Sequence, residues 1–133
     1  MLYFAYGSNL HHFQIKKRCK DSVFLRKIYL KNFTLTFRSR YRAADIEPKK
    51  NSKVPGALFE ISKSDEKKLD VYEDYPILYK KYYFNYYGKK VMTYTMTKKT
   101  AFTFPTEHYL NIVKRGYRDC DLDKNYLKQA LKA

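Results

Sequence analysis

The sequence predicts a single α+β domain, built as a small barrel-like mixed β-sheet with helices on its outside. Strand-like apolar segments with a few helices between them fill most of the chain, and two helical segments close it. This order of elements is typical of α+β proteins. The length of 133 residues matches one domain, and 44% hydrophobic residues is too many for a disordered chain. Residues 1–133 are therefore expected to form one domain with its own core.

Four apolar stretches in the first half of the chain are predicted to be strands, at residues 2–6, 23–29, 33–37 and 54–61. The third alternates most clearly between large apolar side chains and threonines. A helix over residues 10–20 is expected after the first strand, with Ser8 or Asn9 as its N-cap. The stretch 38–53 is polar and contains a proline, so we expect a loop there with a short strand near residues 43–46.

The second half is predicted to begin with a helix that has Ser64 as its N-cap and two acidic residues in its first turn. This helix should end near Asp74, because a proline follows two residues later. A β-hairpin centred on Gly88 comes next, and Asp121 or Asp123 should cap the last helix. The hairpin strands and the two closing helices are expected at residues 79–87, 91–96, 106–117 and 122–131.

The formal net charge of +15 at pH 7 raises the question of nucleic-acid or membrane binding. The lysines, however, are scattered through the chain in ones and twos, and the sequence holds no recognition-helix, zinc-finger or RNA-binding aromatic motif. No apolar run approaches the roughly 18–20 residues of a membrane helix. We expect a solvated basic surface, with no specific nucleic-acid partner and no membrane partner.

The cysteine and histidine spacings favour neither disulfides nor a metal. Cys19 and Cys120 are the two cysteines, and their spacing matches no disulfide framework or zinc site. The acidic stretch 119–123 opens like a calcium loop but lacks the glycine and glutamate that such a loop requires. The N-terminus has no basic leader or cleavage site. The expectation is a cytoplasmic protein without a metal, as a monomer or homodimer.

Two segments are candidates for chemistry. In the first, residues 3–9, an apolar strand runs into Gly-Ser-Asn, whose N–H groups on a concave turn suit a carboxylate or a developing oxyanion. In the second, residues 69–76, Glu73 and Asp74 fall at a helix C-terminus, where the helix dipole disfavours negative charge. A carboxylate there among tyrosines could have a raised pKa and act as a general base. Taken singly, each segment also fits an ordinary turn or an exposed acidic helix end.

Together, the segments resemble the γ-glutamylcyclotransferase-like family. The resemblance is carried by Tyr3-Phe4-Ala5-Tyr6-Gly7-Ser8-Asn9-Leu10, Val54–Phe59, Leu69–Pro76 and Pro105–Leu110. It implies a small mixed β-barrel with flanking helices and a cavity at the end of the first strand. It also implies a reaction in which the α-amine of a γ-glutamyl compound attacks its own γ-carbonyl. The products are 5-oxoproline and a free amine or amino acid, and no cofactor or metal takes part.

The same resemblance assigns site residues. Glu73 is expected to be the catalytic acid/base that takes a proton from the α-amine and returns one to the leaving nitrogen. Tyr79 and Tyr94 are expected at the pocket wall, although each fits a core or cross-strand tyrosine equally well as a ligand contact. The expected substrate contacts are Tyr3, Phe4, Ala5, Tyr6, Gly7, Ser8, Asn9, Tyr109 and Tyr79.

An alternative is a non-catalytic small-molecule binding module on the same fold, although a pure binder would have no need of a base at Glu73. Specificity for the leaving group is expected from two variable loops, at residues 38–53 and 98–104. The first of these carries Arg38, Arg40 and Arg42. These arginines lead to the hypothesis that the leaving portion of the substrate is acidic.

Overall fold

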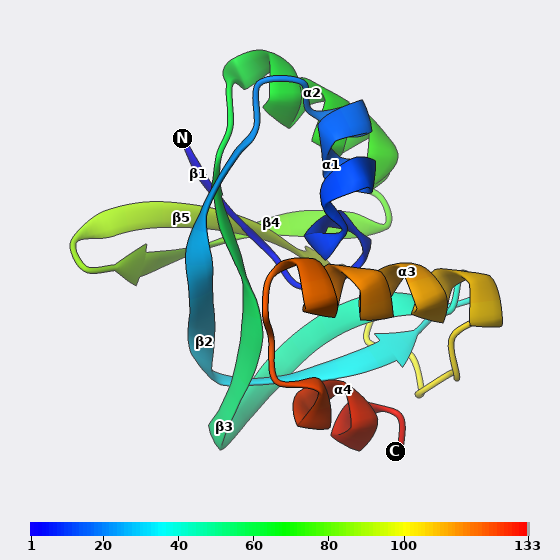
Figure 1. Ribbon diagram of the computed structural model, residues 1–133. Helices are drawn as coiled ribbons and strands as arrows, with labels where there is room; N and C mark the ends of the chain where they lie inside the picture. Colours follow the sequence, from blue (N-terminus) through cyan, green and yellow to red (C-terminus); the bar gives the residue numbers. More distant parts are fainter. Residues whose placement is uncertain (133) are drawn as a thin grey trace.

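The computed structural model describes residues 1–132 and confirms the α+β class. Five strands form one mixed sheet in the order β2-β3-β1-β5-β4, and the helices lie around it (Figure 1). The strands are β1 (Leu2–Ala5), β2 (Val23–Arg38), β3 (Ala43–Glu60), β4 (Tyr79–Tyr86) and β5 (Lys89–Met96). The helices are a 3-10 turn η1 (Ser8–Leu10) and the α-helices α1 (His12–Arg18), α2 (Lys63–Tyr72), α3 (Glu107–Asp119) and α4 (Lys124–Ala130).

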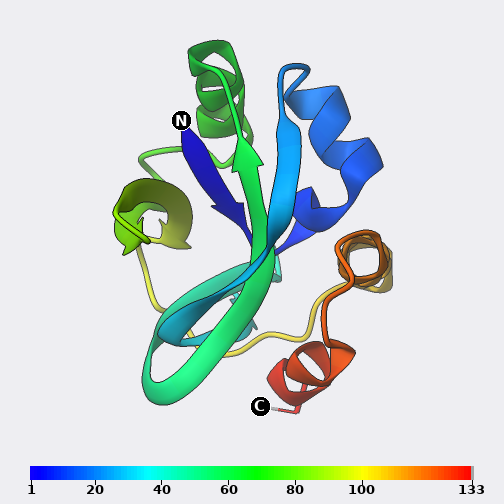
Figure 2. The same ribbon diagram turned by 60° about the vertical axis from the view of Figure 1, so that its left-hand side comes forward.

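The long β2–β3 ribbon gives the sheet its curvature. The two strands pair antiparallel from Val23 opposite Glu60 to Arg38 opposite Ala43. The register shifts twice, and at the second shift residues 49–52 of β3 have no partner on β2. The ribbon bends strongly along its length (Figure 2). In residues 1–132 no pairing joins β2 to β4, so the expected barrel takes the form of a curved sheet with these two strands at its ends.

The ribbon corrects the prediction for residues 38–53, most of which belong to β3 and not to a loop. This half of β3 pairs only with β2, so one of its sides is free of strand partners. Pro48 is tolerated there because an edge does not require its missing N–H. The side chains of residues 48–51 are also exposed, so the segment shows none of the apolar alternation by which strands are usually recognised.

Two predicted helix starts were placed wrongly. The helix expected over residues 10–20 is split into η1 and α1, and neither Ser8 nor Asn9 caps it with a side chain. Helix α2 is capped by Ser62 and not by Ser64, because Ser62 and Asp65 exchange hydrogen bonds of 3.1 and 3.2 Å in a capping box. The end of α2, the β4–β5 hairpin and the two closing helices agree with expectation, and Asp123 caps α4.

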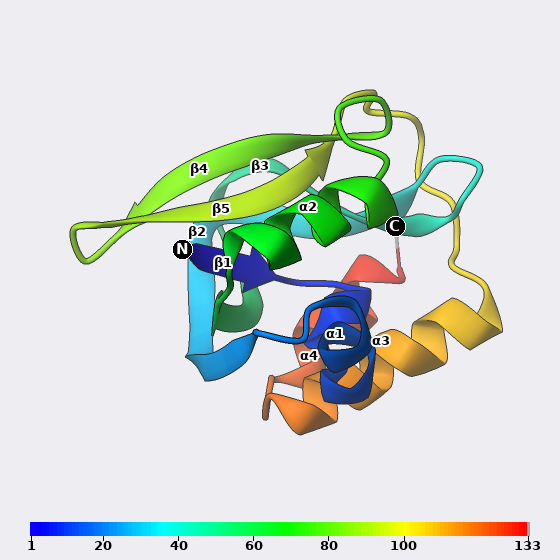
Figure 3. The same cartoon turned by 90° about the horizontal axis from the view of Figure 1, so that it is seen from above.

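Close packing brings the N-terminal segment to the centre of the molecule. Seen from above, α2 lies between the β4–β5 hairpin and the group formed by α1 and α3 (Figure 3). Helix α3 packs on η1 at Gly116, where a Cβ atom would lie 2.4 Å from the Cβ of Leu10. Only glycine allows so close an approach, so this contact fixes where the turn after β1 lies. No helix within residues 1–132 has the length and apolar character needed to cross a membrane.

Candidate active site

A cavity of about 480 Å³ opens where β1 ends, which is where the sequence resemblance placed it. Its volume lies in the usual range for small-molecule sites, roughly 300–1,000 Å³. Tyrosines make up much of its wall, and carboxylates from the end of α2 lie on one side. The lining residues are Tyr3, Tyr6, Gly7, Ser8, Asn9, Tyr41, Ala43, Ala44, Val71, Tyr72, Glu73, Asp74, Leu78, Tyr79, Thr93, Tyr94 and Tyr109.

The turn between β1 and η1 forms the floor of this cavity. A Cβ on Gly7 would lie 3.2 Å from both the Ala44 Cβ and the Tyr109 hydroxyl, so glycine lets β3 and α3 close in on the turn. Ser8 and Asn9 open η1, and the first N–H groups of a helix have no acceptor inside it. Their N–H groups have no other acceptor within residues 1–132. They are available to an anionic group in the cavity.

Two expected substrate contacts lie elsewhere. Phe4 is fully buried and packs edge-to-face on Phe84, with ring centroids 5.7 Å apart. Ala5 is also buried, and neither residue lines the cavity. The alternation of side chains along a strand explains Phe4, since it turns Tyr3 and Phe4 to opposite faces of the sheet. The other expected contacts all line the cavity.

Glu73 is the C-cap of α2, where its N–H donates to the Leu69 carbonyl at 2.8 Å. The side chain is half-buried, and its carboxylate receives no hydrogen bond or ion pair from residues 1–132. Burial raises the pKa of Glu73 to about 8, against a smaller opposing effect of the positive charge of Arg18. The dipole of α2, whose negative end lies at Glu73, further disfavours the negative charge of this carboxylate. An unpartnered carboxyl group with such a pKa suits proton transfer near neutral pH.

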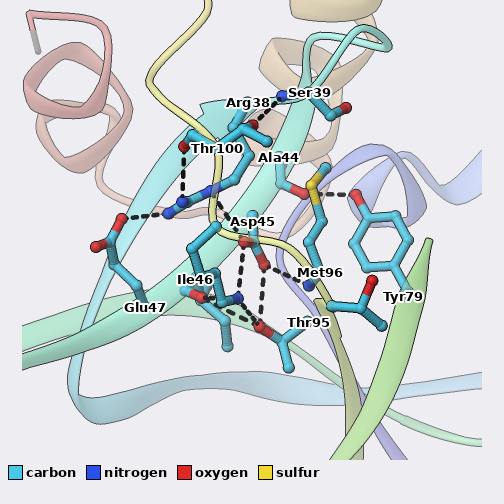
Figure 4. Close-up of polar contacts among 12 residues, drawn as sticks. Arg38, Ser39, Ala44, Asp45, Ile46, Glu47, Tyr79, Thr95, Met96 and Thr100 are labelled. Atoms are coloured by element: carbon cyan, nitrogen blue, oxygen red, sulfur yellow. Dashed lines mark hydrogen bonds and ion pairs between the residues drawn. The ribbon is translucent and has the colours of Figure 1, made fainter. Parts of the chain in front are cut away.

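The tyrosine hydroxyls are fixed in place by main-chain groups. Tyr79 donates to the Ala44 carbonyl at 2.6 Å (Figure 4), and the Ala44 N–H donates to the Tyr109 hydroxyl at 3.1 Å. Tyr6 donates to the Tyr94 carbonyl at 2.7 Å. Burial raises the pKa of these three phenols, so they remain neutral hydrogen-bonding groups. These hydrogen bonds hold the cavity wall in place without a ligand.

A buried ionic cluster lies next to this wall (Figure 4). Asp45 is fully buried, and its carboxylate lies 3.1 Å from the Arg38 Nε and 2.9 Å from the Lys99 Nζ. The other oxygen of Asp45 accepts from the Thr95 hydroxyl at 3.0 Å and from the Met96 N–H at 2.8 Å. The cluster ties β3 to β5 and the following linker, and so holds the neighbouring Ala44 in place.

The three arginines expected to favour an acidic leaving portion are engaged outside the cavity. Arg38 is buried in the ionic cluster, and Arg42 donates to the Phe104 carbonyl at 2.6 Å. Arg40 donates to the Tyr41 hydroxyl at 2.9 Å. None of the three lines the cavity, whose outer part is instead bordered by Tyr41 and Val71. The structural basis of that hypothesis is therefore absent.

Arg18 was not identified from the sequence, and its contact with Tyr72, one of the tyrosines of the segment 69–76, was not expected. Their side chains meet beside the turn, with the Arg18 guanidinium 3.4 Å from the centre of the Tyr72 ring. The partners are 54 positions apart, and both are surrounded by other charged or aromatic residues, so no local spacing marks them. In residues 1–132, no group of three or more His, Cys, Asp or Glu side chains is arranged to hold a metal ion.

The comparisons with known proteins agree with this geometry. The family model described as gamma-glutamyl cyclotransferase, AIG2-like, matches residues 3–117. The chain belongs to this family. As a member of the AIG2-like gamma-glutamyl cyclotransferases, it carries both segments of the candidate site, the turn after β1 and the end of α2, inside the matched region. A search of curated protein sequences finds no match.

Solved structures resemble this AIG2-like chain over its whole length. A gamma-glutamyl cyclotransferase is 27% identical, with a TM-score of 0.84, over 100% of this chain and 86% of the other. An uncharacterized protein from Homo sapiens is 28% identical, with a TM-score of 0.82, over 99% of this chain and 86% of the other. YkqA from Bacillus subtilis has a TM-score of 0.80 over 100% of this chain and 54% of the other; at 23% identity it shows the fold alone.

Proposed function

We propose that the protein is a cyclotransferase that converts a γ-glutamyl amino acid or amine to 5-oxoproline and the free amine, with Glu73 as general acid/base. The observation that carries the proposal is the unpartnered Glu73 carboxyl group, with its pKa raised to about 8, in one cavity with the free N–H groups of Ser8 and Asn9. The family membership and the similarity to a solved gamma-glutamyl cyclotransferase support it.

The first step is proton removal from the substrate α-amine, which is largely protonated at neutral pH. Ionised Glu73 accepts this proton, and the free amine attacks the γ-carbonyl carbon. A new C–N bond closes a five-membered ring, and negative charge moves to the carbonyl oxygen. The N–H groups of Ser8 and Asn9 are the proposed donors to that oxygen, or to the substrate carboxylate.

Glu73 then returns the proton to the leaving nitrogen, the original amide C–N bond breaks, and the carbonyl of 5-oxoproline re-forms. The ring nitrogen carries two hydrogens and a positive charge after the attack, and it gives its second proton to Glu73. Glu73 passes this proton to the departing amine, so the reaction is balanced without any added reagent and Glu73 is ionised for the next cycle. A base with a pKa near the working pH serves both proton transfers, because it neither holds nor gives up its proton too readily.

Orientation is the other contribution we assign to the protein. The reaction is intramolecular, so its rate depends on holding the glutamyl group bent with amine and carbonyl in contact. Tyr6, Tyr79 and Tyr109 are suited to this, since their hydroxyls already have main-chain partners. The proposed contacts are Tyr3, Tyr6, Gly7, Ser8, Asn9, Tyr79 and Tyr109.

The test is release of 5-oxoproline from a panel of γ-glutamyl amino acids and amines, with Glu73→Gln as the decisive variant. The amide keeps the shape of the side chain but cannot accept the proton, so we expect release to fall by about 10²–10⁴-fold. Glu107→Gln, at an exposed position in the first turn of α3, is the matched control. Absence of release from every compound with the wild type would favour the non-catalytic binding module.

A further inference from the structure

We propose that Arg18 is a positioning residue for the cyclisation. It holds the turn after β1, which contains Ser8 and Asn9, against the end of α2 that carries Glu73. The inference rests on the proposed function. Arg18 is the last residue of α1 and is half-buried, but it does not line the cavity. It therefore acts on the chemistry through the residues that it contacts.

The geometry joins two elements through one side chain. One guanidinium nitrogen of Arg18 donates to the Ser8 hydroxyl at 3.2 Å and to the Asn9 side-chain carbonyl at 2.5 Å. The central carbon of the guanidinium group lies over the Tyr72 ring, 3.4 Å from its centre. The Tyr72 hydroxyl is 3.1 Å from the Ser8 hydroxyl and closes the arrangement. Two residues of the turn and the residue before Glu73 are thus held together.

A further hydrogen bond fixes the nitrogen end of the Asn9 side chain. The Asn9 side-chain nitrogen donates to the Tyr3 hydroxyl at 3.0 Å, while its oxygen accepts from Arg18. Asn9 is buried, so both ends of its side chain need partners. Without Arg18 the Asn9 oxygen would lose its donor, and the turn would lose the bond that fixes its orientation.

Arg18 also supplies a positive charge to a cavity that contains none. No residue lining the cavity is a lysine, arginine or histidine. Burial raises the pKa of Glu73, Tyr3 and Tyr109, and the charge of Arg18 counters the rise at each of them. The other charged or titratable side chains around Glu73 are Tyr6 after β1, Tyr79 on β4, Tyr94 on β5, and Asp70, Tyr72 and Asp74 around the end of α2.

Geometry and charge can be separated with two substitutions. Arg18→Gln removes both the charge and the fork of donors, whereas Arg18→Lys keeps the charge and loses the flat stacking surface. Lys17→Gln is the matched control, because Lys17 is the preceding residue of α1, is exposed, and lies over the Phe13 ring with no side-chain hydrogen bond or ion pair within residues 1–132. It removes one positive charge without touching the turn.

The experiment combines steady-state kinetics of 5-oxoproline release with a ¹³C NMR titration of the glutamate carboxyl groups, in which Glu73→Gln identifies the Glu73 signal. For Arg18→Gln we expect KM to rise about tenfold, which corresponds to the loss of one charge-assisted hydrogen bond. We also expect the Glu73 titration to move to higher pH than in the wild type. Arg18→Lys should keep the wild-type titration but share the raised KM, and Lys17→Gln should change neither.

A KM and a Glu73 titration in Arg18→Gln that both match Lys17→Gln would overturn the inference. Near-UV circular dichroism checks that each variant is folded. If Arg18→Gln does not fold, Arg18→Lys decides, and a wild-type KM there would overturn the positioning role. An inactive wild type would overturn the proposed function itself, whereas an active wild type with unaffected Arg18 variants would overturn only this inference.

Discussion

At the scale of single residues, Glu73 combines a functional advantage with a cost in stability. Burial favours the neutral form of the side chain, and this raises its pKa to about 8. The unfolded chain, in which the group is solvated, ionises near the ordinary value of 4.5. Folding must therefore suppress an ionisation that water would allow. Under the proposed function, this cost in stability accompanies a pKa that suits proton transfer.

This cost has a definite pH dependence. Because the folded pKa of Glu73 is raised, the stabilising contribution of the neutral group is complete below about pH 4.5 and is lost as pH rises through about 8. Glu73→Gln removes the ionisation, so we predict a gain in unfolding free energy of about 1–3 kcal/mol at pH 8 and none near pH 4. Urea unfolding at both pH values measures it. An equal gain from Glu107→Gln would contradict the assignment to Glu73.

At the scale of elements, the site is assembled by three contacts between segments distant in sequence. Helix α3 presses on η1, the ionic cluster binds β3 to β5, and the end of α2 meets the turn after β1. Each contact places one part of the cavity wall. The fold can therefore be weakened at one contact without loss of the others, which makes separate predictions possible.

The contact between α3 and η1 depends on the absence of a side chain at Gly116. In Gly116→Ala the new methyl group would lie 2.4 Å from the Leu10 Cβ and 2.7 Å from the His11 nitrogen, so α3 must move away. We predict a loss of about 1–3 kcal/mol in unfolding free energy from this overpacking. The displaced turn should also raise the KM for the γ-glutamyl substrate. Lys114→Ala, at an exposed position of α3, is the control and should change neither quantity.

Substitution at the buried centre of the ionic cluster is predicted to lower the unfolding free energy far more than substitution at its exposed edge. Asp45→Asn leaves the guanidinium of Arg38, only 3% exposed, without its buried counter-charge, and should cost about 3 kcal/mol in unfolding free energy. Glu47→Gln removes the other carboxylate bound to Arg38, but that side chain is 43% exposed. Its loss should cost less than about 1 kcal/mol. Equal losses in the two variants would show that burial does not control this cluster.

At the scale of the whole molecule, the two thiols report on the integrity of the core. Cys19 and Cys120 are buried in the single apolar cluster, and burial raises the pKa of each to about 12. Since the thiolate is the reactive form, we predict that neither reacts with a disulfide reagent in the native protein. Both should react together as urea unfolds the chain. Rapid modification of one thiol without urea would contradict this.

The net charge of +15 is also a property of the whole surface. The basic residues are spread over all four α-helices and several strands, and we predict only weak, sequence-independent binding to DNA. Such binding should be lost as salt rises from about 50 to 200 mM, because it depends on counterion release. Fluorescence anisotropy with two unrelated duplexes measures it. A preference for one duplex that survives at the higher salt would show a nucleic-acid site.

The sequence by itself determined the α+β class, the hairpin, the closing helices and the two segments that meet at the cavity. The first three features depend on neighbouring residues, through alternation, capping and turn chemistry, so local patterns reveal them. The two segments at the cavity were indicated by the resemblance to the family, because each taken singly also fits an ordinary turn or helix end. Phe4 and Ala5 show the limit of that reasoning. They belong to the same motif as Tyr3 and Gly7, but a motif does not state which side chains face a cavity.

Only the tertiary structure decided how far β2 and β3 extend, which serine caps α2, and that Arg18 joins the turn to Tyr72. For the strands and for Arg18 the deciding partner is distant in sequence: a strand along one edge, or a ring 54 positions away. For α2 the choice between two nearby serines is decided by the capping box of Ser62 with Asp65. A polar edge strand is held by main-chain hydrogen bonds, which leave no apolar pattern in its residues. The contacts of a long charged side chain likewise depend on what the fold brings within its reach.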